Sequence, residues 1–230
     1  QQRVLAVERG ADHRRAPQAD LYNYEVLAAG PRAEPNYVDT TSYLGTPDVR
    51  RSKQAVAVDL NGDRYPDVAV ANYGEANSVY FYNQYDGALH EATSQALGAQ
   101  LSSKTTSVVA VDVDADDDLD LVFGNDGQQS RLYINNGKGA FDDVTARETA
   151  DGAKRMPVGE WSTQMVLADD FNGDNAIDLY LVNKGYSGEV NRLLLNDSLG
   201  VFRDVTNLYI LNPRADKSVW AISGDVDGDK

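Results

Sequence analysis

Residues 59–67 read DLNGDRYPD, and this nine-residue pattern organises the whole chain. Two further complete copies read DVDADDDLD at 112–120 and DFNGDNAID at 170–178, and a shortened copy reads DVDGD at 225–229. Oxygen-bearing side chains occupy positions 1, 3, 5 and 9 of each complete copy. Because calcium takes roughly 6–8 oxygen ligands, the pattern indicates a repeated site for a hard cation.

One backbone carbonyl usually joins the side chains in such a loop, and position 7 is where we expect it: Tyr65, Asp118 or Ala176. An EF-hand is excluded because it requires glutamate at position 12, which is apolar in all three complete copies. Magnesium is disfavoured because it retains its waters and rarely uses all-protein cages. A solvated turn that binds nothing is the plain alternative, and the three copies in register argue against it.

The charge and composition restrict the function classes. The formal net charge of −15 argues against a nucleic-acid partner, because nothing would neutralise the phosphates. The chain has no cysteine, so disulfides and cysteine-ligated zinc are excluded. No apolar run is long enough for a transmembrane helix, and no signal peptide is visible. Weak calcium sites fill in millimolar calcium, so we expect a secreted, extracellular or periplasmic location.

Short apolar runs flank each loop at regular spacing, as expected for strands. One run precedes each loop, one follows it, a third leads to a Gly/Asn/Asp turn, and a fourth carries a short signature such as FDDVT at 141–145. The repeats cover 54–93, 107–145 and 164–206. We expect an incomplete repeat at 1–41 and a first strand with a partial loop at 219–230.

A unit of four short strands describes a blade of a β-propeller. We therefore predict an all-β fold and one propeller-type repeat domain over 1–230, with about four repeat equivalents. A small closed ring, a half-propeller that pairs with a second copy, and a piece of a longer protein all remain open.

The loop, the following strand that ends in Asn, the Asn-Gly turn and the Phe-x-Asp-Val-Thr signature together resemble FG-GAP/VCBS repeats. Such repeats are similar to the calcium-binding blades of the integrin α-subunit propeller. The resemblance implies three Ca²⁺ sites and a partial fourth. Its implied side-chain ligands are Asp59, Asn61, Asp63 and Asp67; Asp112, Asp114, Asp116 and Asp120; Asp170, Asn172, Asp174 and Asp178; and Asp225, Asp227 and Asp229.

The family usually has glycine at position 6, where this chain has Arg64, Asp117 and Asn175. This departure predicts strained loops. Outside the loops, we interpret His90 as a surface residue of a strand and expect Trp220 to pack in the core. No catalytic cluster stands out.

Two classes of function follow. The first is a secreted calcium-binding module for adhesion or for binding a glycan or protein ligand. The second is an enzyme of the polysaccharide-lyase type on a propeller scaffold, so enzymatic activity stays an open question. An architectural subunit, completed by self-association or by further blades, is a third possibility.

Overall fold

A computed structural model of the chain describes residues 50–99, 102–150, 152–185 and 188–224. The chain divides into two units, Gln1–Thr40 and Thr41–Lys230, and every described residue belongs to the second. The incomplete repeat expected at 1–41 and the shortened loop at 225–229 therefore lie outside the described residues.

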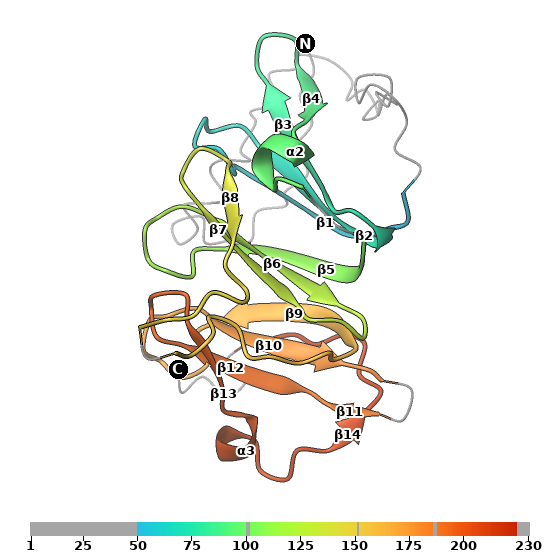
Figure 1. Cartoon of the computed structure of the whole chain (residues 1–230), viewed down its shortest axis with the longest axis vertical. Helices are drawn as coiled ribbons and strands as arrows, with labels where there is room; N and C mark the ends of the chain where they lie inside the picture. Colours follow the sequence, from blue (N-terminus) through green and yellow to red (C-terminus); the bar gives the residue numbers. More distant parts are fainter. Residues whose placement is uncertain (1–49, 100–101, 151, 186–187, 225–230) are drawn as a thin grey trace, which may run out of the picture. The chain divides into compact units, whose positions relative to one another are not determined.

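The described residues form three antiparallel blades of four strands each, and strand pairing joins the first two blades into one eight-stranded sheet (Figure 1). The first blade contains β1 (Ser52–Val58), β2 (Asp67–Glu75), β3 (Ser78–Asn83) and β4 (Ala88–Glu91). The second contains β5 (Ser103–Val111), β6 (Asp120–Asn125), β7 (Arg131–Asn135) and β8 (Phe141–Asp143). The third contains β9 (Thr163–Asp169), β10 (Asp178–Asn183), β12 (Arg192–Asn196) and β13 (Phe202–Asp204).

The same register recurs in each blade. The second and third strands pair Val68 with Tyr80, Leu121 with Tyr133, and Leu179 with Leu194. Each nine-residue loop connects the first strand of a blade to the second, so the three loops occupy equivalent places. The predicted all-β class and blade pattern are confirmed.

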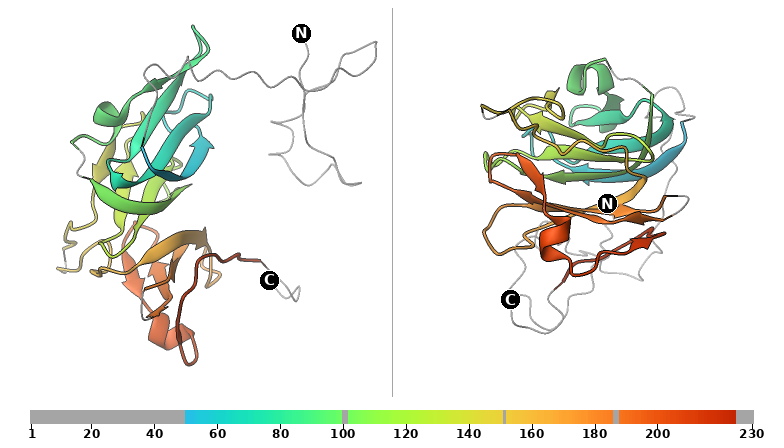
Figure 2. Two further views of the ribbon diagram at one scale, coloured as in Figure 1. Left: turned by 90° about the vertical axis from the view of Figure 1, so that its right-hand side faces the viewer. Right: turned by 60° about the horizontal axis from the view of Figure 1, so that its bottom comes forward.

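Short elements follow the fourth strands of the first and third blades (Figure 2). These are the helices α2 (Thr93–Ala96) and α3 (Thr206–Tyr209). Each is a single turn, which is much too short to cross a membrane. Two-residue strands β11 (Glu189–Val190) and β14 (Ala215–Asp216) pair with one another. In every blade a threonine hydroxyl accepts the backbone N–H of the third strand: Thr93 from Val79, Thr145 from Leu132 and Thr206 from Leu193.

Two apolar clusters hold the blades together, one on either face of the second blade. One contains Leu60, Ala69 and Val79 of the first blade with Leu121 and Phe123 of the second. The other joins side chains of the second blade to side chains of the third: Val113, Val122, Leu132, Val166, Leu179, Leu181 and Leu194. Because successive strand residues point to opposite faces, β6 is buried along its whole length.

The outer face of the third blade, which no described blade covers, is more exposed to solvent than these interfaces. At loop position 2, Leu60 and Val113 are each 1 % exposed, whereas Phe171 in the third loop is 37 % exposed. Leu60 and Val113 lie against the blade that follows in sequence, and no described blade follows the third. Trp220, expected in the core, is instead 67 % exposed, and residues 219–224, expected to begin a first strand, form no strand.

Candidate metal centre

The aspartate at loop position 1 shapes each loop by accepting backbone N–H groups. Asp59 Oδ1 accepts from Gly62 at 2.7 Å, and its Oδ2 accepts from Arg64 at 2.6 Å. Asp112 accepts equivalently from Ala115 at 2.8 Å and Asp117 at 3.0 Å. Each of these carboxylates therefore holds the backbone of its own loop in a tight turn.

Asp170 repeats the arrangement in the third loop, where it accepts from Gly173 and Asn175, both at 2.8 Å. The hydrogen bond from the Asn175 backbone, followed by those from Gly173 and Asp174, lowers the pKa of Asp170 below its usual value. This carboxylate is thus ionised and already oriented.

The aspartate at position 9 is buried in every loop and joins it to the third strand. Asp67 accepts from the Leu60 and Tyr82 backbones at 3.0 and 2.9 Å. The equivalent pairs of bonds reach Asp120 from Val113 and Asn135, and Asp178 from Phe171 and Asn196. Each carboxylate oxygen has a second lone pair, so these bonds leave room for a cation on the same oxygens.

Burial shifts the pKa of all three position-9 carboxyls upward. Desolvation is the largest cause, and the backbone hydrogen bonds only partly offset it. The effect is greatest for Asp120, whose pKa rises to about 7. The negative charges of the aspartates at positions 3 and 5 raise the pKa of Asp120 further. A cation bound nearby would therefore favour the ionised form of this carboxyl.

The loop backbone is left-handed at positions 4 and 6. Position 6 has φ of 70° at Arg64, 70° at Asp117 and 69° at Asn175. Left-handed backbone costs most non-glycine residues about 1–2 kcal/mol, but Asn and Asp adopt it more readily. The strain expected from the missing glycines is therefore greatest at Arg64 and smaller at Asp117 and Asn175. The second loop carries a further such residue, Ala115 at φ 62°, where the other loops have glycine.

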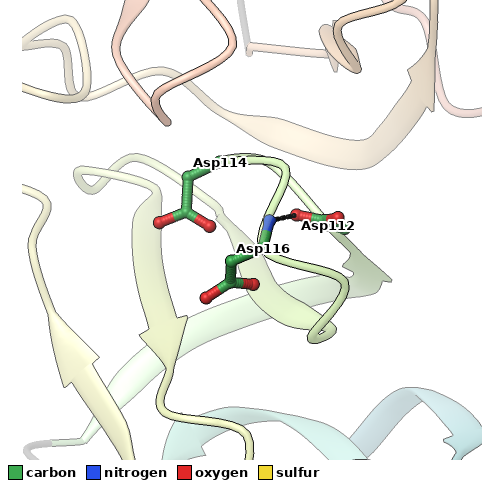
Figure 3. Close-up of side chains that lie close together, drawn as sticks. All are labelled: Asp112, Asp114 and Asp116. Carbon is green, nitrogen blue, oxygen red and sulfur yellow. Dashed lines mark hydrogen bonds between the residues drawn. The ribbon is translucent and has the colours of Figure 1, made fainter.

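The second loop brings three carboxylates together. Asp112, Asp114 and Asp116 each offer one oxygen, and these oxygens all lie within 4.8 Å of one another (Figure 3). Asp116 also accepts the Asp118 backbone N–H at 3.0 Å. Such a group of hard oxygen donors suits a calcium-sized cation.

Asp114 is the least satisfied of these carboxylates. Its Oδ1 is buried and has no hydrogen-bond partner. Desolvation, then the charges of Asp116 and Asp112, raise the pKa of this carboxyl. A buried acceptor without a partner costs free energy, so this oxygen marks the place where a cation fits best.

The first and third loops have asparagine at position 3, which changes the local bonding. Asn172 donates from Nδ2 to Asp174 Oδ2 at 2.8 Å and accepts the Asp174 N–H at 2.8 Å. Asn61 likewise accepts the Asp63 N–H at 3.0 Å. These two loops satisfy their own donors and acceptors more fully than the second loop.

The residues expected to supply carbonyls at position 7 differ in environment. Tyr65 is exposed and stacks on Tyr82 with ring centroids 5.3 Å apart, whereas Ala176 is buried. Asp118 lies with its carboxylate close to Gly137 of the neighbouring turn. In each case the backbone N–H at position 7 donates to the carboxylate at position 5, which fixes the peptide.

Sequence reasoning missed an asparagine clamp between blades. Asn135 Nδ2 donates to the carbonyl of Leu60, in the preceding blade's loop, at 2.9 Å. Asn196 Nδ2 donates to Val113 at 2.7 Å in the same way. The recurrent Asn at the end of the third strand was the available signal. Each clamp ties one nine-residue loop to the next blade.

A protein-family model for the FG-GAP-like repeat matches residues 59–123 and 170–230, which include the loops described above. This chain belongs to the FG-GAP-like repeat family. The resemblance inferred from the loops and the strand signatures is thereby confirmed. All three complete loops fall within the matched FG-GAP-like repeats.

One curated relative is cartilage acidic protein 1 of Xenopus tropicalis, which is 25 % identical over 154 residues. The aligned part covers 65 % of this chain and 24 % of that protein. The chain therefore spans about a quarter of the relative's length.

Proposed function

We propose that this chain is a calcium-binding propeller module that acts in adhesion or in binding a protein or glycan ligand outside the cell. The observation that carries the proposal is the second loop, where three carboxylates converge and Asp114 Oδ1 is buried without a partner. Arg155 offsets only part of the negative charge around Asp114, and calcium would supply the rest.

The proposed ligands are the side chains at positions 1, 3, 5 and 9 and the carbonyl at position 7 of each loop. Asp112, Asp114, Asp116 and Asp120 would give the second loop four carboxylates. The first and third loops would each supply three carboxylates and one asparagine amide. More carboxylates raise calcium affinity, so we expect the second loop to fill first.

The role proposed for the metal is structural. Each loop connects the first two strands of its blade, and Asn135 and Asn196 bond the loops of the preceding blades. A cation that fixes the loop would therefore also fix the contact between blades. Because repeat proteins gain stability from neighbouring interfaces, calcium would stiffen the whole array.

An extracellular location is proposed on two grounds. The family typically occurs outside cells, and exposed acidic loops of this type need the higher calcium concentration found there. The net charge of −15 keeps the module soluble and disfavours nucleic acid. Ligand binding would then use the loops at the ends of the blades.

Thermal unfolding in calcium and in EDTA tests the calcium part. Calcium at 100 times the dissociation constant of one site adds about 2.7 kcal/mol, which corresponds to about 5–10 °C in Tm for a protein of this size. Magnesium at the same concentration is the matched control and should shift Tm far less. Equal Tm values in calcium and EDTA would contradict calcium binding.

The ligand-binding part needs a separate experiment. The calcium-loaded protein would be tested on a glycan array and against extracellular-matrix proteins immobilised on a sensor. Saturable binding to either supports the proposal. Binding to neither, together with cleavage of acidic polysaccharides measured by uronate release, would replace it with an enzymatic role.

A further inference from the structure

An arginine–carboxylate pair recurs beside the start of the third strand of each blade. In the second and third blades the arginine is the first residue of the third strand, whereas in the first blade it is Arg50, which precedes β1. The acidic partner is the last residue of the fourth strand in every blade. The three pairs are Arg50–Glu91 at 3.1 Å, Arg131–Asp143 at 2.7 Å and Arg192–Asp204 at 3.3 Å. The recurrence allows the three blades to be compared residue by residue.

The blades differ in what lies beside this pair. The difference lies at the residue nine positions before the aspartate at loop position 1. This residue is Arg50 in the first blade, Ser103 in the second and Trp161 in the third. In the third blade the Trp161 indole covers Arg192, with the guanidinium carbon 5.1 Å from the ring centroid. In the first blade this position supplies the arginine itself, and Arg50 bonds the Ser78 hydroxyl.

The second blade has the arginine but not the ring. Ser103 is too small to cover Arg131, and a groove of about 330 Å³ lies there instead. The Arg131 side chain is 44 % exposed, against 27 % for Arg192 beneath its indole. The groove thus occupies the place that Trp161 fills in the next blade.

The walls of the groove are held in place by hydrogen bonds. Gln128 Oε1 accepts the Lys104 backbone N–H at 2.8 Å, and Asn77 Oδ1 accepts that of Asn72 at 3.0 Å. Tyr133, which also lines the groove, packs edge-on against Phe123. These contacts pre-form the groove, which lowers the entropic cost of filling it.

The charge of the groove selects the chemistry of the occupant. Asp143 already neutralises Arg131, so an anionic ligand would meet a carboxylate 2.7 Å from its intended partner. A neutral flat ring meets no such penalty, because it stacks on the face of the guanidinium while the edge keeps its ion pair.

We propose that this groove binds an aromatic side chain, tryptophan or tyrosine, presented by a partner protein. The ring would lie on Arg131 as Trp161 lies on Arg192. A protein partner is favoured over a sugar because the chain's own occupant of the equivalent position is an aromatic side chain. The inference rests on the ligand-binding part of the proposed function, and it does not depend on calcium.

The first test titrates the full-length, calcium-loaded protein with N-acetyltryptophanamide and follows backbone amide signals by NMR. We expect saturable shifts at Ser103, Gln128 and Arg131. N-acetylleucinamide and glucose are the matched probes without an aromatic ring, and each should bind about tenfold more weakly or not at all.

Reciprocal variants sharpen the test. Ser103→Trp should fill the groove as in the third blade, keep the fold and abolish binding of the probe. Arg131→Lys keeps the charge but removes the flat guanidinium, so it should weaken binding about tenfold. Trp161→Ser should uncover Arg192 and create a second site, seen as new shifts around Arg192.

The outcomes separate the inference from the calcium proposal. Equal binding of tryptophan and leucine probes, or stronger binding of glucose, would overturn the aromatic groove. Undiminished binding by a folded Ser103→Trp protein would do the same. Neither result alters the calcium-dependent Tm, which therefore tests the metal sites separately.

Discussion

The second and third loops have the same length, place and backbone, yet they differ in how far they satisfy themselves. In the second loop Asp114 leaves a buried oxygen without a partner, and Ala115 is held at φ 62°. In the third loop Asn172 bonds Asp174, and glycine occupies the left-handed position 4.

This difference separates a loop whose polar groups satisfy one another from a loop that leaves a buried carboxylate oxygen without a partner. Replacing one asparagine by aspartate at position 3 adds a fourth carboxylate and removes an amide donor. The energetic consequence is repulsion and desolvation, which a divalent ion would reverse. If the proposed calcium sites are correct, the second loop should therefore depend on calcium more strongly than the third.

The largest effect is expected from Asp120→Ala. The change leaves the buried backbone N–H groups of Val113 and Asn135 without an acceptor, at about 1–3 kcal/mol each. We expect a loss of about 3–5 kcal/mol in urea unfolding, measured in EDTA. Asp178→Ala is the matched control and should cost less, because its Phe171 partner is exposed. Equal losses would show that the third loop is as well protected as the second.

The asparagine clamp gives the next effect. Asn135→Ala removes donors to the Leu60 and Leu119 carbonyls and an acceptor for Gly139, so we expect a loss of about 2 kcal/mol. Asn196→Ala should cost about 1 kcal/mol, because its Oδ1 has no partner to lose. The urea midpoints of the two variants measure this difference. A larger loss of stability for Asn196→Ala than for Asn135→Ala would contradict the expected order.

The pH dependence should reverse when calcium is added. The raised pKa of Asp120, about 7, means that the folded protein without metal holds a proton that the unfolded chain releases near pH 4. The contribution of the Asp120 carboxyl to the free energy of unfolding is therefore fully present below pH 4 and is lost as the pH rises through 7.

Calcium needs the ionised carboxylate, so calcium stabilisation should instead grow as pH rises from 5 to 8. Tm measured across this range in EDTA and in calcium tests both slopes. Asp120→Asn is the control and should flatten the pH dependence in EDTA. Parallel slopes in the two buffers would contradict the assignment of Asp120 to the metal site.

The smallest effect concerns position 4. Ala115→Gly should stabilise the protein by up to about 1 kcal/mol, because glycine tolerates the left-handed backbone. Gly173→Ala should destabilise it by about 1 kcal/mol through strain alone, since a Cβ there meets no other atom within 4 Å. Effects of the same sign for both variants would exclude backbone strain as the cause.

Much of the fold could be predicted because the repeat supplies its own alignment. A third apolar run before each Gly/Asn/Asp turn was expected to be a strand, and the third strands have equivalent registers at Val79, Leu132 and Leu193. Position 6 was expected to be strained, and it has positive φ in each loop. These features depend on residues that are close together in the sequence, so the loop and strand patterns predict them.

The remaining features depend on contacts between blades. The Asn135 clamp reaches a carbonyl far away in sequence, and the unpartnered Asp114 oxygen depends on burial that no single loop reveals. Trp220 was expected in the core, but it lies in a segment without a strand and is exposed. The metal ligands themselves remain predictions.

Calcium titration by isothermal calorimetry, on the wild-type protein and on Asp114→Asn, tests the central claim most directly. Asp114→Asn gives the second loop the position-3 residue of the first and third loops. We predict that the wild type binds calcium with one tighter site, and that the variant loses this site while its weaker sites persist. Identical isotherms for the two proteins, or no calcium binding by the wild type, would contradict the account.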